Sequence, residues 1–237
     1  HRAFAEGIAD DIWDKRFDLI NYYMPVEEAA SIAKAYKRTT GPLIIADYAD
    51  NPGGGGYGDS TNLLKALLDA GVADAAFGPM VDPETAQQLH RHKVGERVKV
   101  RLGGKSDPRF GGEPLSLEGE IRLISDGFYT GDGPMVGGLR LGWGDTAVLR
   151  VGGIDILVVS EPSQMLDLQQ FRAFGIDPAA KTVVGLKSMQ HFRAAFEPIA
   201  GKVIVCDSGA LCTTHLEKLP YRNVPRPIYP IDRDMKL

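Results

Sequence analysis

Residues 42–61 read PLIIADYADNPGGGGYGDST, and this stretch decides the fold. Residues 42–47 form a continuous apolar run that ends in Asp47, which is typical of a strand buried on both faces of a parallel sheet. Four consecutive glycines follow, and residues 60–70 then return to helical spacing with a stripe of leucines. The stretch therefore predicts a strand, a glycine-rich loop over residues 50–61, and an amphipathic helix.

The segments on both sides of this stretch continue the alternation of helices and strands. Helices are expected over residues 2–17, after Pro25, over 83–90, over 164–174 and from Ser188. Strands are expected over residues 73–77, 182–186 and 202–206, and residues 208–237 read as irregular and Pro-rich. Such alternation predicts parallel strands with flanking helices.

The pattern of apolar and polar residues changes between about residues 96 and 160. Short runs there alternate apolar and polar residues, and Gly152-Gly153 is a hairpin signal. We therefore predict an α/β fold with a mostly antiparallel β-rich insertion at about residues 96–160, in a single domain over residues 1–237.

Composition excludes several classes of protein. The net charge of −4 argues against a nucleic-acid-binding face, which is usually basic. No run of about 18 apolar residues occurs, so we expect no membrane-spanning helix. Only two cysteines occur, Cys206 and Cys212, which favours a reducing compartment and a cytoplasmic location.

The glycine-rich loop is the first candidate site. It joins a buried strand to a helix, where ligands of α/β sheets bind, and its backbone N–H groups with the helix N-terminus favour an anion. Asp47, Asp50 and Asp59 would oppose a bare phosphate, and the Gly-Lys-Ser/Thr ending of a P-loop is absent. The alternative is a glycine-rich turn in which Asp59 or Ser60 only caps the helix.

The second candidate is the stretch KSMQHFR at residues 187–193, also at a strand end. Lys187 precedes the expected cap and His191 falls in the expected first turn, where a neutral imidazole could donate or accept a hydrogen bond. The alternative is a surface lysine and a histidine with a local partner. The other histidines and the two cysteines have no metal-site or nucleophile spacing, so we expect structural roles for them.

Four stretches together resemble the MlrC-type proteins, a microcystinase C-like family of zinc metallopeptidases. They are DNPGGGGYGDST at 50–61, FRAFGIDP at 171–178, KSMQHFRAAF at 187–196 and RPIYPID at 226–232. They occur in the order of the family's C-terminal part. The resemblance implies that an N-terminal domain, which carries the zinc ligands, lies upstream and is absent from this chain.

The resemblance also implies a function. The complete protein would hydrolyse peptide bonds, and this chain would supply the wall of the active cleft that binds substrate or oxyanion. The residues implied to bind substrate are Asp50, Asn51, Gly53, Gly54, Gly55, Gly56, Asp59 and Ser60, with Lys187 and His191 as catalytic candidates. This chain alone is expected to hold no zinc and to be inactive.

Other readings stay open at this stage. The chain is alternatively a non-catalytic binding module whose glycine-rich loop holds a small anion or a partner chain. The expected partners are the upstream domain of the same protein and a peptide substrate, and the sequence leaves a homo-oligomer open.

Overall fold

The computed structural model describes residues 1–18 and 20–236. They form two compact units, a larger one over Met24–Thr213 and a smaller one made of the two terminal segments. Whether residues 1–237 make a single domain stays a prediction.

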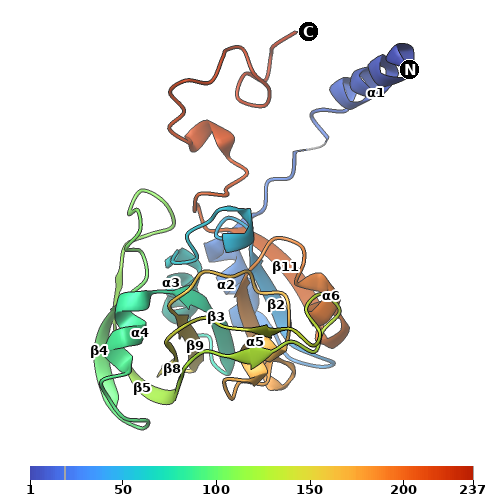
Figure 1. Ribbon diagram of the computed structural model, residues 1–237. Helices are drawn as coiled ribbons and strands as arrows, with labels where there is room; N and C mark the ends of the chain where they lie inside the picture. Colours follow the sequence, from blue (N-terminus) through green and yellow to red (C-terminus); the bar gives the residue numbers. More distant parts are fainter. Residues whose placement is uncertain (19, 237) are drawn as a thin grey trace. The chain divides into compact units, whose positions relative to one another are not determined.

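The larger unit is built on one mixed sheet of nine strands (Figure 1). Across the sheet the strands are β1 (Met24–Pro25), β11 (Lys202–Asp207), β2 (Leu43–Asp47), β10 (Val183–Lys187), β3 (Ala75–Val81), β9 (Ile154–Val159), β8 (Thr146–Val151), β5 (Leu115–Ser125) and β4 (Arg97–Leu102). The first six run parallel, and β9, β8, β5 and β4 pair antiparallel. A separate two-stranded sheet joins β6 (Tyr129–Thr130) to β7 (Arg140–Leu141). This arrangement confirms the predicted α/β fold with its antiparallel part between residues 96 and 160.

Both faces of the parallel half are buried, which explains its continuous apolar sequence. In β2, Leu43 and Ile45 enter one core, while Ile44 and Ala46 enter the other. The first core is closed by α2 (Val26–Ala35), α3 (Asn62–Asp69) and α4 (Pro83–Leu89), and the second by α5 (Gln169–Arg172) and α6 (Arg193–Phe196). Helices therefore flank the sheet on both faces, as the sequence predicts.

Two predicted helices are much shorter than expected. The helix predicted over 164–174 is only α5, because Gln170 Oε1 accepts hydrogen bonds from the N–H groups of Leu166 and Asp167 and holds these residues outside the helix. The helix predicted from Ser188 begins only at Arg193. Ser188 is not its cap, since the Ser188 hydroxyl bonds to Gln164 instead.

Strand β4 lies at an edge of the sheet, and α4 covers it. Gln88 Nε2 donates to the Lys99 carbonyl at 2.9 Å, and Thr85 Oγ1 donates to the Arg101 carbonyl at 3.1 Å. Asp82 caps α4, accepting from Thr85 N at 3.0 Å. Side chains thus occupy acceptors that an unprotected edge strand would offer to another chain.

The smaller unit contains α1 (Arg2–Asp14) and the C-terminal segment. The predicted helix over 2–17 is confirmed as far as Asp14, and its apolar residues Phe4, Ile8 and Ile12 are exposed. Tyr229 packs edge-on against Trp13 and donates to the Arg16 carbonyl at 2.6 Å. Of the helices in residues 1–18 and 20–236, none combines the length and the apolar character needed to cross a membrane.

Candidate functional site

The pairing of strands β2 and β10 places two charged residues, Asp47 and Lys187, side by side. Lys187 and Asp47 are the last residues of β10 and β2, and they are paired across these two parallel strands. Because side chains alternate between the faces of a sheet, both point to the face covered by α3. Both are completely buried, and Lys187 Nζ lies 3.7 Å from Asp47 Oδ2.

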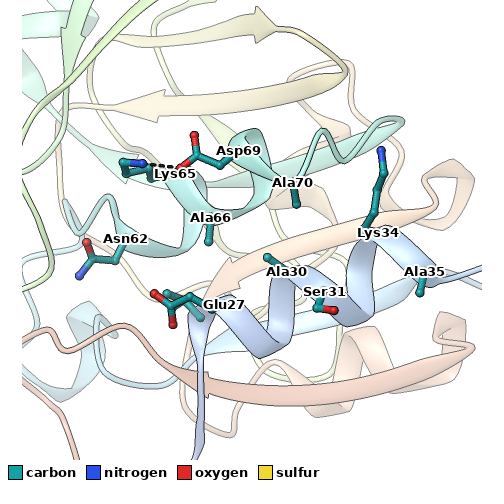
Figure 2. A pocket seen from close by; sticks show the side chains of 11 residues that line it. Glu27, Ala30, Ser31, Lys34, Ala35, Asn62, Lys65, Ala66, Asp69 and Ala70 are labelled. Carbon is teal, nitrogen blue, oxygen red and sulfur yellow. Dashed lines mark hydrogen bonds and ion pairs between the residues drawn. The ribbon is translucent and has the colours of Figure 1, made fainter.

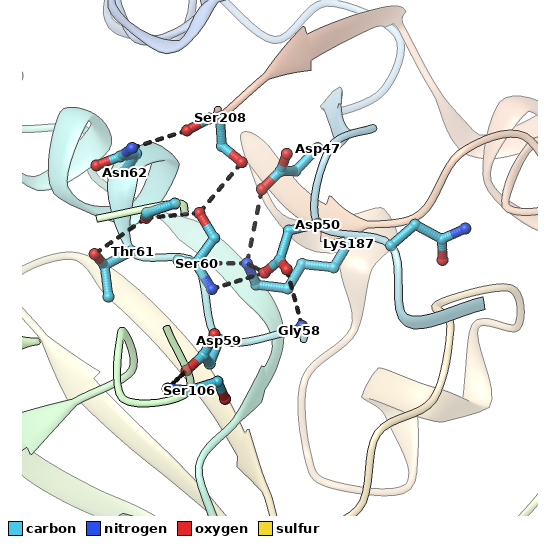
Figure 3. A network of polar contacts seen from close by, with 12 residues as sticks. Asp47, Asp50, Gly58, Asp59, Ser60, Thr61, Asn62, Ser106, Lys187 and Ser208 are labelled. Atoms are coloured by element: carbon cyan, nitrogen blue, oxygen red, sulfur yellow. Dashed lines mark hydrogen bonds and ion pairs between the residues drawn. The ribbon is translucent and has the colours of Figure 1, made fainter. Parts of the chain in front are cut away.

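Lys187 ties the end of β10 to the glycine-rich loop (Figure 3). Its ammonium group donates to Asp50 Oδ2 at 2.6 Å and to the Ser60 carbonyl at 2.8 Å. Burial lowers the pKa of Lys187, but the carboxylates of Asp50 and Asp47 outweigh burial and raise that pKa above its usual value. The two carboxylates therefore favour the charged form of this lysine.

Asp50 is the anion that the glycine-rich loop surrounds. Its Oδ1 accepts from Gly58 N at 2.8 Å, and its Oδ2 accepts from Ser60 N at 2.7 Å as well as from Lys187. The side chain is 1% exposed. The loop thus closes around its own carboxylate, with a lysine as counter-charge.

The other N–H groups of the glycines also have partners within the loop. Asn51 Oδ1 accepts from Gly53 N at 3.1 Å, and the Asn51 carbonyl accepts from Gly54 N and Gly56 N at 3.0 Å. Gly55 N donates to the Pro52 carbonyl. The expectation that these groups are free to hold an external anion is therefore wrong for this conformation.

Asp59 and Ser60 face the interior of the protein. Asp59 Oδ2 accepts from Lys105 N and Ser106 N at 2.9 and 2.8 Å, and Ser60 Oγ donates to the Gly111 carbonyl at 2.8 Å. Neither residue caps α3, because Thr61 occupies the N-cap position without a side-chain hydrogen bond. The alternative in which Asp59 or Ser60 only caps the helix is therefore wrong, since both side chains bond to the 103–113 loop instead.

His191 is an exposed member of the candidate set, as are Gly53, Gly54 and Gly55. Its Nδ1 lies 3.3 Å from Gln164 Oε1, and Gln164 Nε2 donates to Ser188 Oγ at 3.0 Å. A Cβ on Gly53 would stand 2.3 Å from Gln164 Oε1, so the amide rests directly on the glycine-rich loop. The structure thus brings His191 and the loop together through Gln164, a residue that the sequence analysis did not single out.

Asp47 is a buried carboxylate without a hydrogen bond. Among the described residues, neither of its oxygens has a hydrogen-bond partner. Burial is the main cause that raises the pKa of Asp47 to about 6, with the Asp50 carboxylate adding to the rise while Lys187 and the nearby Ser208 hydroxyl oppose it.

The cysteines and the carboxylates do not form a metal centre. Burial raises the pKa of the Cys206 and Cys212 thiols, so neither is an activated nucleophile. In the described part of the chain, no group of three or more His, Cys, Asp and Glu side chains is placed to hold a metal ion. The residues present therefore do not fit a zinc site, and no catalytic step through a metal follows from this chain alone.

A groove of ≈ 820 Å³ lies elsewhere, between α2 and α3 (Figure 2). Small side chains such as Ala30, Ala66 and Ala70 line it, with Glu27, Lys34 and the Lys65–Asp69 ion pair around them. Its charges are mixed in sign and it lacks convergent catalytic groups, so the candidate site remains at the carboxyl ends of β2 and β10.

Comparison with known proteins identifies the family of the chain. The family model described as MlrC C-terminus matches residues 45–223, which include the glycine-rich loop and the turn of His191. The chain belongs to the MlrC C-terminus family.

A curated relative is microcystinase C of Sphingomonas sp., which is 31% identical over 205 residues. The match covers 86% of this chain, and the chain spans 38% of that protein's length. A crystal structure from Mesorhizobium sp. BNC1 of a "Putative metallopeptidase" matches with a TM-score of 0.86 at 23% identity, over 98% of this chain and 45% of that one. At that identity, the match establishes the fold alone.

The compactness of the glycine-rich loop can be tested with a matched pair of variants. A Cβ on Gly56 would lie 2.9 Å from the Asp50 backbone carbon, whereas one on Gly54 would come closest to the flexible end of Met189 and would stand at an ordinary contact distance of 3.4 Å from Cys212 Sγ. We expect Gly56→Ala to lower the free energy of unfolding by about 1–3 kcal/mol, and Gly54→Ala by clearly less. Urea denaturation of both variants measures this, and equal losses would contradict the packing described here.

Proposed function

We propose that this chain is the C-terminal part of an MlrC-like metallopeptidase that hydrolyses peptide bonds, and that it forms one wall of the active cleft. Family membership supports the reaction class. The observation that carries the site is that the glycine-rich loop and the His191 turn follow two adjacent parallel strands, β2 and β10. In α/β sheets, ligands bind at this end of the strands.

The candidate residues fall into an exposed group and a buried group, and we assign a different role to each. Gly53, Gly54, Gly55 and His191 are exposed, so we assign substrate contact to them. Asp50, Asn51, Asp59, Ser60 and Lys187 are buried behind them. We propose that these residues hold the loop in shape, and that Lys187 affects catalysis through Asp50 without touching substrate.

The zinc of the proposed peptidase would reside on the N-terminal domain of the complete protein. This chain contributes hydrogen-bonding groups opposite that domain, among them the exposed His191 imidazole, whose ring nitrogens can donate and accept hydrogen bonds. A cytoplasmic location stays a prediction, and a homo-oligomer stays open.

The test uses the complete protein, that is, this chain joined to its upstream segment. It should hydrolyse members of a panel of linear peptides, lose this activity with a chelator, and regain it when metal is returned. His191→Ala should reduce kcat/KM on the order of 100-fold, the usual loss when a proton-transfer group is removed. His92→Ala is the matched control, because His92 lies on the far α4–β4 connection and bonds to Glu96.

Two outcomes would contradict the proposal. Chelator-insensitive turnover would remove the metallopeptidase assignment, and full activity of His191→Ala would remove the cleft-wall role. Failure of the complete protein to hydrolyse any peptide would favour the alternative, a binding module that holds a small anion or a partner chain. The paired N–H groups of the loop argue against the anion version of that alternative.

A further inference from the structure

Gln164 lies at the junction of the two loops of the candidate site. It belongs to the 160–168 connection that follows β9, and its side-chain amide contacts three places at once: Ser188, His191 and Gly53. We propose that Gln164 is a positioning residue that fixes His191 as the Nδ1–H tautomer and leaves Nε2 as an acceptor for the substrate. The substrate part of this inference rests on the proposed function, but the tautomer does not.

The argument begins with the orientation of the amide. A glutamine amide has one acceptor, its carbonyl oxygen, and one donor group, its NH₂. In the structure, the NH₂ donates to Ser188 Oγ at 3.0 Å and the oxygen faces both His191 Nδ1 and Gly53. In the reversed orientation the NH₂ would press against a Gly53 Cα–H group, which offers no acceptor, whereas an oxygen there makes a weak favourable contact.

The orientation of the amide dictates the state of the imidazole. An oxygen 3.3 Å from His191 Nδ1 can only accept, so Nδ1 must carry the hydrogen. A neutral imidazole has one N–H, so Nε2 is then left with a lone pair. Free histidine in water prefers the opposite tautomer, with the hydrogen on Nε2. The protein therefore selects the less common form and gives His191 an accepting nitrogen on an exposed face.

Gly53 acquires a specific role in this arrangement. A Cβ at position 53 would stand 2.3 Å from Gln164 Oε1 and 3.2 Å from its Cδ, so any other residue would displace the amide. Gly53 thus provides the space through which the glycine-rich loop, Gln164 and His191 are coupled. Two distant substitutions, at 53 and at 164, should then have the same effect on His191.

The tautomer can be measured directly by heteronuclear NMR of the imidazole nitrogens in the chain of residues 1–237, at a pH where the ring is neutral. We expect wild-type His191 to carry its hydrogen on Nδ1. Gln164→Leu and Gly53→Ala should each change the tautomer ratio by about three- to tenfold toward Nε2–H, the effect of losing one hydrogen bond. The His191 signal is assigned with His191→Asn, and His90 and His92 serve as unchanged internal references.

The matched control is Gln88→Leu, which removes a glutamine amide that bonds to the Lys99 carbonyl on β4. It should leave the His191 tautomer unchanged. An Nε2–H tautomer in the wild type would overturn the inference, as would a ratio that Gln164→Leu and Gly53→Ala do not alter. If one variant fails to fold, the wild-type tautomer and the other variant still decide.

A second measurement links the tautomer to the reaction. In the complete protein, Gln164→Leu should lower kcat/KM, and the double variant with His191→Ala should be no worse than His191→Ala alone, because the two residues act as one unit. Additive losses would show that Gln164 acts independently of His191. If the complete protein hydrolyses no peptide, the proposed function fails, while the NMR result still stands for or against the role of Gln164.

Discussion

Lys187→Met should lower the free energy of unfolding by about 3–5 kcal/mol, because it leaves two buried carboxylates without a counter-charge. Lys187 is fully buried and donates to Asp50 Oδ2 at 2.6 Å, while Asp47 Oδ2 lies 3.7 Å from its Nζ. The methionine would fill most of the space, so the loss would come from electrostatics more than from a cavity. Urea denaturation of the wild type and the variant measures the difference.

The control for this prediction is Lys65→Met. Lys65 pairs with Asp69 on the exposed side of α3, where such a pair contributes less than about 0.5 kcal/mol. Adding Asp47→Asn to Lys187→Met should recover part of the stability, because one of the two stranded charges is then removed. A Lys187→Met protein as stable as the wild type would mean that the Asp50 carboxylate is held by Gly58 N and Ser60 N alone.

The parallel half of the fold could be predicted from the sequence because strands that are buried on both faces have continuous apolar sequences. The run LIIAD over residues 43–47 has no polar residue before its end, and the structure places Leu43–Asp47 as β2 with five buried residues. The helix over residues 83–90 and the Gly152-Gly153 hairpin could also be predicted, since each depends on the residues themselves and their immediate neighbours.

The site was less predictable, because its contacts join distant residues. Lys187 and Asp50 are 137 positions apart in the sequence, and only the pairing of β10 with β2 brings them together. The four glycines indicated free N–H groups, but the loop turns back on Asn51 and uses them. Gln164 had no local signal, since its partners Ser188 and His191 lie on another strand's loop.

The contribution of Asp47 to the free energy of unfolding should fall as the pH rises, which is opposite to the usual trend for a carboxylate. The pKa of Asp47 is raised from 3.8 to about 6, chiefly by burial, so the folded state binds a proton more tightly than the unfolded state does. Stability contributed by this residue is therefore highest below pH 3.8 and falls as the pH rises to about 6. This difference between the folded and the unfolded pKa of Asp47 corresponds to on the order of 3 kcal/mol in the free energy of unfolding. A carboxylate stabilised by hydrogen bonds would show the opposite trend.

Asp47→Asn isolates this contribution, because asparagine has nearly the same shape and does not titrate. The stability of Asp47→Asn relative to the wild type should be more favourable at pH 7 than at pH 4, by on the order of 3 kcal/mol. Urea denaturation at both values measures the difference, and Asp69→Asn on the exposed side of α3 is the matched control. A relative stability that is the same at both pH values would show that Asp47 finds a partner that keeps it charged. That result would also weaken the prediction for Lys187→Met, because Lys187 would then not be the main counter-charge of the two buried carboxylates.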